Sequence, residues 1–311
     1  MVMGAGAMGS AVGGFLAMAG HDVVLIGRPA HMEVIKKKGL FVSGIWGEHV
    51  VRKLRTYTEV PSLMPWQPDV VFITVKSYDT ETAVRQILPK IGQETLICSF
   101  QNGLGNVETI ARCAGRQRTI AARVIFGVRL KEPGSIVITV IAEPSAIGPF
   151  SREAPRDKVR ALASEMDKAG LPTIYVEEIM PLIWAKVAYN SALNPLSALL
   201  NVPYGALLKA EESRQIMRNV IHELYEVAKA CGVRLQPPTA ELYVKKLFEE
   251  LIPPTSAHYA SMREDFLSHR RTEIDALNGA IVRLGKERGI SCPTNELLTK
   301  LVKARERTYS F

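Results

Sequence analysis

The stretch Gly4-Ala5-Gly6-Ala7-Met8-Gly9, near the start of this chain of 311 residues, decides the fold of its first half. It fits the pattern G-x-G-x-x-G, in which the first glycine permits a tight turn and the second lets the backbone approach a pyrophosphate. The third glycine lets a helix pack closely on a strand, and free N–H groups at the start of that helix favour an anion. An amphipathic segment, Gly20-His21 and a β-rich run follow at the expected spacing, so we predict that these six residues bind a dinucleotide.

The end of the next β-rich run, Leu25-Ile26-Gly27-Arg28, bears on which dinucleotide is bound. An acidic residue about 20 residues after the glycine loop would bind the ribose 2′-hydroxyl of NAD and repel the 2′-phosphate of NADP. Arg28 stands there instead, and a guanidinium group can make two charge-assisted hydrogen bonds to a phosphate. The sequence therefore favours NADP, with an ordinary surface arginine at a strand end as the alternative.

The first half of the chain alternates short apolar runs with helical patterns. The predicted strands are Val23–Ile26, Val70–Val75, Thr95–Ser99 and Ile120–Phe126, and the predicted helices are Gly9–Met18, Thr80–Ile91 and Leu104–Cys113. Strands with little polar alternation, separated by helices, predict a parallel sheet covered on both faces, a doubly wound Rossmann-type fold. Only Met1–Met3 precede the glycine loop, whereas a central strand has about 5 to 6 residues, so we expect the natural chain to start upstream.

The pattern changes after Lys131. Pro133-Gly134 predicts the turn of a hairpin whose second strand covers Ile136–Ile141. A helix over Arg156–Ala169 and a strand over Thr173–Val176 follow. The second half is predicted to be helical over Met180–Asn194, Glu211–Ala230, Pro238–Leu251, Met262–Gly289 and Asn295–Arg307. We therefore predict an α/β domain over residues 1–177 and an all-helical domain over residues 178–311.

Composition and charge argue against several classes of protein. The hydrophobic fraction of 47% and the charged fraction of 23% are typical of a globular protein, and no apolar run approaches the roughly 20 residues that span a bilayer. The net charge of +8 comes from short basic groups without interleaved aromatic residues, which argues against nucleic acid and suits anionic ligands. Four cysteines and six histidines are scattered, so no metal site is predicted. Without a signal-peptide pattern, we expect a cytoplasmic protein.

A row of polar residues marks the first helix predicted for the second domain. Lys186, Asn190 and Asn194 are spaced four apart, so on an α-helix they form one slanting row among apolar neighbours. Burying them without partners would be costly, which indicates a site, although ordinary helix-surface residues explain the spacing equally well. Because Pro195 disfavours regular helix at Asn194, we expect the row to end there at a kink.

A second polar group comprises Ser261–Asp265 and Arg270–Asp275, and by pattern alone it is a solvated helix face. A resemblance gives it another meaning, because the chain resembles the ketopantoate reductase family over nearly its whole length. The stretches that carry the resemblance occur in the family's order and with similar spacing. They are Gly4–Gly9, Gly27-Arg28, Val75-Lys76, Gln101–Asn106, Ile147–Pro149, KVAYNSALNPLSAL at 186–199, Ser261-Met262 and Arg270–Asp275.

The resemblance implies a Rossmann domain joined to a helical domain, and the reduction of 2-ketopantoate (2-dehydropantoate) to (R)-pantoate by NADPH, a step toward pantothenate and coenzyme A. It implies that Lys186 donates a proton to the 2-keto oxygen, where negative charge develops as hydride arrives. It also implies that Glu273 helps to position substrate and cofactor. The other implied contacts are Asn190 and Asn194 with the substrate's hydroxyl and carbonyl, Ser261 with its carboxylate, and Lys76 and Asn102 with the cofactor.

Two departures from the family leave the 2-oxo acid open. The family usually has Pro-Asn-Gly where this chain has Pro203-Tyr204-Gly205, and Arg123–Val128 lacks the family's threonine-rich, histidine-containing run. Three hypotheses result: a ketopantoate reductase, an NADPH-dependent reductase of another small 2-oxo acid, and a non-catalytic NADP-binding sensor. The sensor hypothesis predicts degeneration at Lys186 and Glu273, and both residues are present. Whether the helical domain forms a homodimer is also left open.

Overall fold

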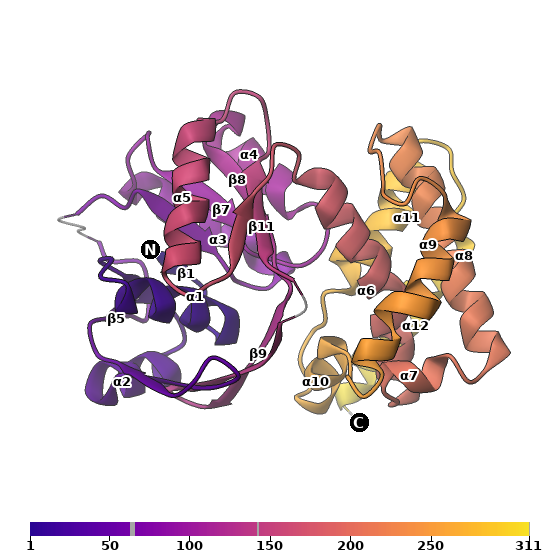
Figure 1. The fold of residues 1–311 in the computed structure, drawn as a ribbon, viewed down its shortest axis with the longest axis horizontal. Coiled ribbons are helices and arrows are strands. Elements are labelled where there is room, and N and C mark those ends of the chain that lie inside the picture. The colour runs from indigo at the N-terminus through magenta and orange to yellow at the C-terminus, as the bar shows by residue number, and fades with distance from the viewer. Residues whose placement is uncertain (63–65, 142, 311) are drawn as a thin grey trace. The chain divides into compact units, whose positions relative to one another are not determined.

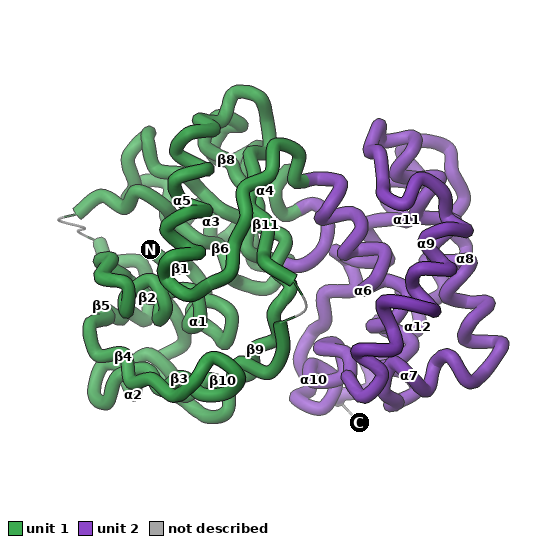
Figure 2. Tube along the Cα trace, in the orientation of Figure 1, with its two compact units in different colours: residues 1–101, 106–179 green, residues 102–105, 180–311 purple. Residues whose placement is uncertain are grey.

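The computed structural model describes residues 1–62, 66–141 and 143–310. The chain forms two compact units, which are described separately (Figure 1; Figure 2). Unit 1 comprises Met1–Gln101 and Asn106–Ile179, and unit 2 comprises Asn102–Gly105 and Met180–Phe311. The short segment Asn102–Gly105 therefore belongs to the second unit, although the segments on both sides of it belong to the first.

Unit 1 is built on an eight-stranded sheet with the order β12-β11-β8-β7-β6-β1-β2-β5. Neighbouring strands are parallel except for the antiparallel pair β11 and β8. The strands are β1 Val2–Met3, β2 Val24–Ile26, β5 Arg55–Tyr57, β6 Val70–Ile73, β7 Leu96–Ser99, β8 Thr119–Arg123, β11 Ser145–Pro149 and β12 Thr173–Tyr175. When the strands of this sheet are numbered by their order along the chain, the six strands from β5 across to β8 have the order 3-2-1-4-5-6. This is the Rossmann order, so the predicted fold class is confirmed.

Helices cover both faces of the large sheet. They are α1 Ala7–Met18, α2 Pro29–Lys38, α3 Thr80–Ile87, α4 Asn106–Ala114 and α5 Arg156–Lys168. Successive side chains of a strand point to opposite faces. On β6, Val71 and Ile73 belong to the core cluster with α3 and α4, whereas Phe72 belongs to the cluster with α1 and α5. Burial on both faces explains why the central strands read as continuous apolar runs.

A second sheet in unit 1 has four strands in the order β4-β3-β10-β9. They are β3 Leu40–Gly44, β4 His49–Val51, β9 Phe126–Glu132 and β10 Ser135–Ile141. The predicted hairpin is confirmed, because β9 and β10 are antiparallel across Pro133-Gly134. The strand predicted over Ile120–Phe126 is wrong at its end, since β8 stops at Arg123 and β9 begins at Phe126.

Unit 2 is helical apart from its turns. Its helices are α6 Met180–Leu200, α7 Tyr204–Leu207, α8 Glu211–Ala230, α9 Ala240–Lys246, α10 Ser261–Leu267, α11 Asn278–Lys286 and α12 Pro293–Arg307, with a π-helical turn at Leu247–Leu251 and a 3₁₀ turn, η6, at Ile274–Ala276. Among the residues that the structure describes, no helix is both long enough and apolar enough to cross a membrane.

The single helix predicted over Met262–Gly289 is wrong. Helix α10 ends at Leu267, and η6 and α11 follow as separate elements. His269 has a positive φ of 49°, and the N–H of Arg270 donates to the carbonyl of Asp265 at 2.8 Å. A left-handed residue and this hydrogen bond close the helix, although neither glycine nor proline marks the position.

Helix α6 continues through Pro195 to Leu200, so the expected end at Asn194 is wrong. Because proline has no N–H, the carbonyl of Ser191, four residues earlier, lacks its helical donor. The Nδ2 of Asn278 on α11 donates to this carbonyl at 3.0 Å, and Asn278 is fully buried. A side chain from another helix thus replaces the missing backbone donor.

Asn278 is one member of a buried polar network. Its Nδ2 also donates to Oδ1 of Asn295 at 3.0 Å, and Nδ2 of Asn295 donates to Glu223 on α8 at 2.7 Å. The backbone N–H groups of Thr294 and Asn295, in the first turn of α12, donate to the same Glu223 carboxylate at 2.8 and 3.0 Å. The carboxylate therefore caps α12 and is favoured by its dipole. The network connects α6, α11, α12 and α8.

We expect Asn278→Ala to lower the free energy of unfolding by about 2 kcal/mol or more, because the carbonyl of Ser191 and Oδ1 of Asn295 lose their shared donor inside the protein. Chemical denaturation of the wild type and the variant measures this loss. Pro195→Ala supplies an N–H at the position that normally bonds Ser191. It should therefore recover part of the loss in the Asn278→Ala background. Equal effects of Pro195→Ala in both backgrounds would contradict the compensation.

Candidate functional site

The predicted dinucleotide loop Gly4–Gly9 leaves the carboxyl end of β1, which lies between β2 and β6. The strand order reverses there, and open sheets of this kind bind ligands beyond the carboxyl ends of such strands. Gly4 has a φ of +100°, and a Cβ on it would lie 2.6 Å from the backbone nitrogen of Val75. A Cβ on Gly9 would lie 2.6 Å from Oγ1 of Thr74. Both glycines therefore permit close packing of the loop and α1 against the end of β6.

Gly6 differs from the other two glycines of the motif. The nearest heavy atom to a Cβ on Gly6 is the carbonyl oxygen of Gly4 at 3.9 Å, so this position faces open space. Gly6 is also the N-cap of α1, with no side-chain hydrogen bond to the cap and no acidic residue in the first turn. The N–H groups at the start of α1 are thus available to an anion, and these residues fit a dinucleotide pyrophosphate.

Arg28 and Lys76 lie at the same edge of the large sheet. A Cβ on Gly27 would lie 3.0 Å from the carbonyl oxygen of Ala5, so Arg28 follows a residue in close contact with the glycine loop. Arg28 is exposed and directly precedes α2. Lys76 is half-buried and comes directly after Val75, the residue packed on Gly4. The structure therefore gathers the glycine loop, Arg28 and Lys76 at the carboxyl ends of β1, β2 and β6, whereas Asn102 belongs to unit 2.

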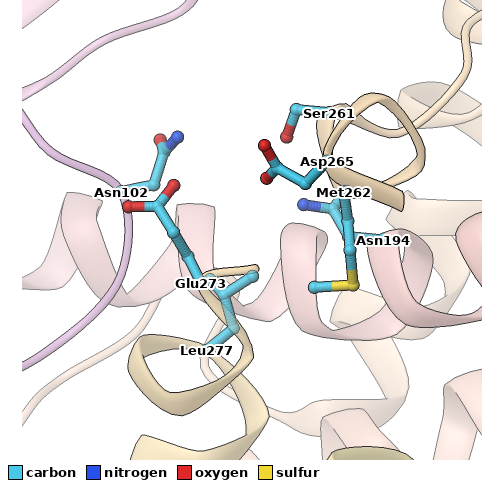
Figure 3. Close-up of a pocket in the computed structure, with 7 residues that line it drawn as sticks. All are labelled: Asn102, Asn194, Ser261, Met262, Asp265, Glu273 and Leu277. Atoms are coloured by element: carbon cyan, nitrogen blue, oxygen red, sulfur yellow. The ribbon is translucent and has the colours of Figure 1, made fainter. Parts of the chain in front are cut away.

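A pocket in unit 2 collects several of the other predicted residues (Figure 3). Its volume is about 10 Å³, room for about one water molecule, so it would hold one end of a ligand rather than enclose it. Lys186 and Asn190 lie on α6 with Asn194 and are half-buried, but they are not among the described residues that line the pocket. The lining residues are Asn102, Asn194, Ser261, Met262, Asp265, Glu273 and Leu277.

Asn102 reaches the pocket through a close backbone contact. The N–H of Leu104 donates to the carbonyl of Ala276 at 2.8 Å, which docks the Asn102–Gly105 segment on η6. Gly103 has a φ of +93°, and a Cβ on it would lie 2.5 Å from the same carbonyl oxygen. Glycine is therefore required at this position for both conformation and space. Glu273 directly precedes η6, so one turn positions Glu273 and supports Asn102.

Asn194 is oriented by a neighbouring tyrosine. The hydroxyl of Tyr204 donates to Oδ1 of Asn194 at 2.7 Å, and both side chains are buried. The amide nitrogen of Asn194 points toward the space in front of Glu273 (Figure 3). Asn194 thus offers the pocket a donor.

Asp265 lines the pocket although it was not among the residues predicted from the sequence. Its side chain is only 4% exposed and pairs with Arg270, Oδ1 to Nε, at 3.2 Å. The interpretation of Ser261–Asp265 as a solvated face is therefore wrong for Asp265 and for the buried Met262. Asp265 is the fourth residue after Ser261 on α10, and this i, i+4 spacing was the available sign that the two share a face.

The pocket combines two kinds of polar group. Asn102, Asn194 and Ser261 supply amides and a hydroxyl, while Asp265 and Glu273 supply carboxylates. Met262 and Leu277 add apolar surface. A few polar groups that converge over apolar walls are typical of sites for small molecules, and this set suits a ligand with both donor and acceptor oxygens.

Two family models together match nearly the whole chain. Residues 1–152 match the family described as "Ketopantoate reductase PanE/ApbA", and residues 178–306 match "Ketopantoate reductase PanE/ApbA C terminal". A protein of Aquifex aeolicus named 2-dehydropantoate 2-reductase is 42% identical over 306 residues, which cover 98% of this chain and 96% of that protein.

Two solved structures have the same fold over the full length. A PanE/ApbA family ketopantoate reductase from Ralstonia eutropha has 32% identity and a TM-score of 0.88, covering 100% of this chain and 99% of that one. A D-mandelate dehydrogenase in a ternary structure with NADH and anilino(oxo)acetate has 26% identity and a TM-score of 0.87, covering 100% and 99%. The second neighbour was solved with NADH, so the fold alone does not decide between the two nicotinamide cofactors.

We expect Gly6→Ala and Gly4→Ala to separate cofactor binding from folding. Gly6 faces open space, so Gly6→Ala should leave the melting temperature nearly unchanged but weaken NADPH binding about tenfold or more, because the methyl group occupies the approach to the pyrophosphate. Gly4→Ala should instead lower the melting temperature, because its Cβ overlaps Val75. Thermal unfolding and NADPH fluorescence titration measure the two effects. NADPH affinity unchanged by Gly6→Ala would contradict the assigned site.

Proposed function

Because this chain belongs to the ketopantoate reductase family and is an oxidoreductase, we propose that it reduces 2-ketopantoate to (R)-pantoate with NADPH. The observation that carries the proposal is the pocket of unit 2, which brings together Asn102, Asn194, Ser261 and Glu273. These residues come from distant parts of the chain. Each was assigned to substrate or cofactor by resemblance alone, so their convergence supports the assignment. In this proposal unit 1 binds the cofactor and unit 2 binds the substrate.

Lys186 has the central role in the proposed reaction. When bound, NADPH would supply the hydride. The Lys186 ammonium polarises the 2-keto oxygen and then gives it a proton, so the negative charge that develops there is neutralised. Its place on α6 supports this role, since the same helix carries Asn190 and Asn194.

The remaining residues bind and orient the substrate. Ser261 donates to the carboxylate, Asn190 and Asn194 hold the hydroxyl and carbonyl, and Glu273 positions substrate and cofactor. Lys76 and Asn102 contact the cofactor. Asp265 lies four residues after Ser261 in the same pocket and, through its pair with Arg270, orders the end of α10.

Arg28 supports NADPH over NADH. It occupies the end of β2, where an NAD-specific site would carry an acidic residue, and its side chain is exposed. Among the described residues, no carboxylate lies within ion-pair distance of Arg28. The guanidinium group is therefore available to a 2′-phosphate.

A second candidate keeps the chemistry and changes the substrate. The similarity to a D-mandelate dehydrogenase, together with Tyr204 beside Asn194, favours a reductase of another small 2-oxo acid. A panel of 2-oxo acids, assayed by NADPH oxidation, separates the two candidates. Ketopantoate should have the highest kcat/KM, and a higher value for another acid would replace it as the proposed substrate.

Lys186→Ala should lower kcat by about 10²- to 10⁴-fold on the best substrate of that panel, as expected for loss of a general acid. Binding of NADPH, measured by fluorescence, should remain within about twofold of the wild type and serves as the control. Turnover above about a tenth of the wild-type value would remove Lys186 from the role of proton donor.

Arg28→Ala should reduce the preference for NADPH over NADH by about tenfold or more, because a charge-assisted hydrogen bond contributes about 1.5–3 kcal/mol. The measurement is the ratio of kcat/KM for the two cofactors. Arg52→Ala removes another exposed arginine of unit 1 and is the matched control for net charge. If both variants change the ratio equally, the effect is general electrostatics and Arg28 does not contact the 2′-phosphate.

A further inference from the structure

Tyr204 stands where the family usually has an asparagine, and its surroundings hold it rigidly. It is 3% exposed and begins α7. Its backbone N–H donates to the carbonyl of His258 at 2.9 Å, and the next N–H, of Gly205, donates to Ser256 at 2.9 Å. Its ring packs edge-on against Tyr189, with centroids 5.9 Å apart, and at a tilt against His258, with centroids 5.4 Å apart. The hydroxyl therefore has little freedom to move.

The turn after α6 brings Tyr204 back to Asn194. Asn201 has a left-handed φ of 57°, the N–H of Val202 donates to the carbonyl of Ser197 at 3.2 Å, and Oγ of Ser197 donates to the carbonyl of Val202 at 2.7 Å. This arrangement reverses the chain at the helix end. The Tyr204 hydroxyl then reaches Oδ1 of Asn194 at 2.7 Å.

This hydrogen bond has a defined direction. Burial raises the pKa of Tyr204 far above its usual value, so the hydroxyl keeps its proton throughout the pH range of enzyme assays. Among the described residues the hydroxyl proton has no acceptor other than Asn194, and it must meet the amide oxygen because the amide nitrogen cannot accept. The Nδ2 of Asn194 has no acceptor among the described residues and faces the pocket (Figure 3).

We propose that Tyr204 is a positioning residue that holds the amide of Asn194 with its N–H toward the pocket, so that this end of the pocket binds an acceptor oxygen of the 2-oxo acid group. The inference rests on the proposed function. It assigns Asn194 to the keto or carboxylate oxygen, which all 2-oxo acids share, rather than to the hydroxyl of ketopantoate. Tyr204 then governs affinity for 2-oxo acids in general.

The first test compares Tyr204→Phe with Tyr189→Phe, using ketopantoate and 2-ketoisovalerate, which lacks the hydroxymethyl group. Tyr204→Phe keeps the ring and removes the donor, so kcat/KM should fall about tenfold with both substrates, mainly through KM. Tyr189→Phe also removes one hydroxyl, which is bonded to Thr255 at 2.9 Å, and should leave KM within about twofold. The KM for NADPH should be unchanged in both variants.

Asn194 provides the second test. In an Asn194→Ala background, Tyr204→Phe should have no further effect on kcat/KM, because Tyr204 acts only through the amide. Asn194→Asp leaves the tyrosine untouched and places a carboxylate oxygen toward the pocket. It should therefore be less active than Asn194→Ala, since it repels an acceptor oxygen. This comparison holds even if Tyr204→Phe does not fold.

The outcomes distinguish the inference from the function on which it rests. A wild-type protein that reduces no 2-oxo acid overturns the proposed function and the inference with it. If the wild type is active, three results would overturn the inference and leave the proposed function standing. These are a Tyr204→Phe loss that persists without Asn194, a loss restricted to ketopantoate, and an Asn194→Asp variant at least as active as Asn194→Ala.

Discussion

The hydrogen bond from Asn278 to the carbonyl of Ser191 is the interaction on which the helical unit depends. Without it, the buried carbonyl of Ser191 would have no donor, because Pro195 lacks the N–H that would normally bond it, and this gap would lie within one turn of Asn194, which lines the pocket. With it, one continuous helix carries Lys186, Asn190 and Asn194 in a single row. The same asparagine bonds Asn295, which in turn bonds Glu223, so α8 and α12 are held by the network that permits the proline.

The fold of unit 1 could be predicted where burial leaves a mark on the sequence. Central parallel strands are covered on both faces and read as apolar runs, which is why β2, β6 and β7 were found. Strands β3 and β4 were missed because they belong to the small second sheet and are only partly buried, at Leu40, Val42 and Val51, so they do not form long apolar runs. The continuation of α6 was missed for another reason. The rule for proline considers local backbone donors, and the donor here lies 87 residues away in sequence.

In the candidate site, too, some residues could be predicted from the sequence and others could not. The resemblance to the ketopantoate reductase family predicted that Asn102, Asn194, Ser261 and Glu273 are site residues. The structure shows that these four line one pocket. The roles assigned to Lys186 and Asn190 remain predictions. Asp265 could not be recognised from the sequence, because a carboxylate among charged neighbours on a short helix is expected to face solvent. In the structure, the turn at His269 brings Arg270 to Asp265, and the Asp265 side chain is buried. The pairing of Tyr204 with Asn194 depends on the left-handed turn at Asn201, and although asparagine favours this conformation, the turn can be placed only when α6 is known to continue past Pro195.

The assignment of Asn102–Gly105 to the helical unit has a consequence for how such proteins can be recombined. The chain passes between the units three times, at Gln101/Asn102, Gly105/Asn106 and Ile179/Met180. A single crossover near Ile179 between two family members would thus produce a hybrid pocket, with Asn102 from one parent and Asn194, Ser261 and Glu273 from the other. Gly103 approaches Ala276 too closely to tolerate a mismatch there. Inheritance of an intact pocket therefore requires two separate segments to be exchanged together, which couples the evolution of the units.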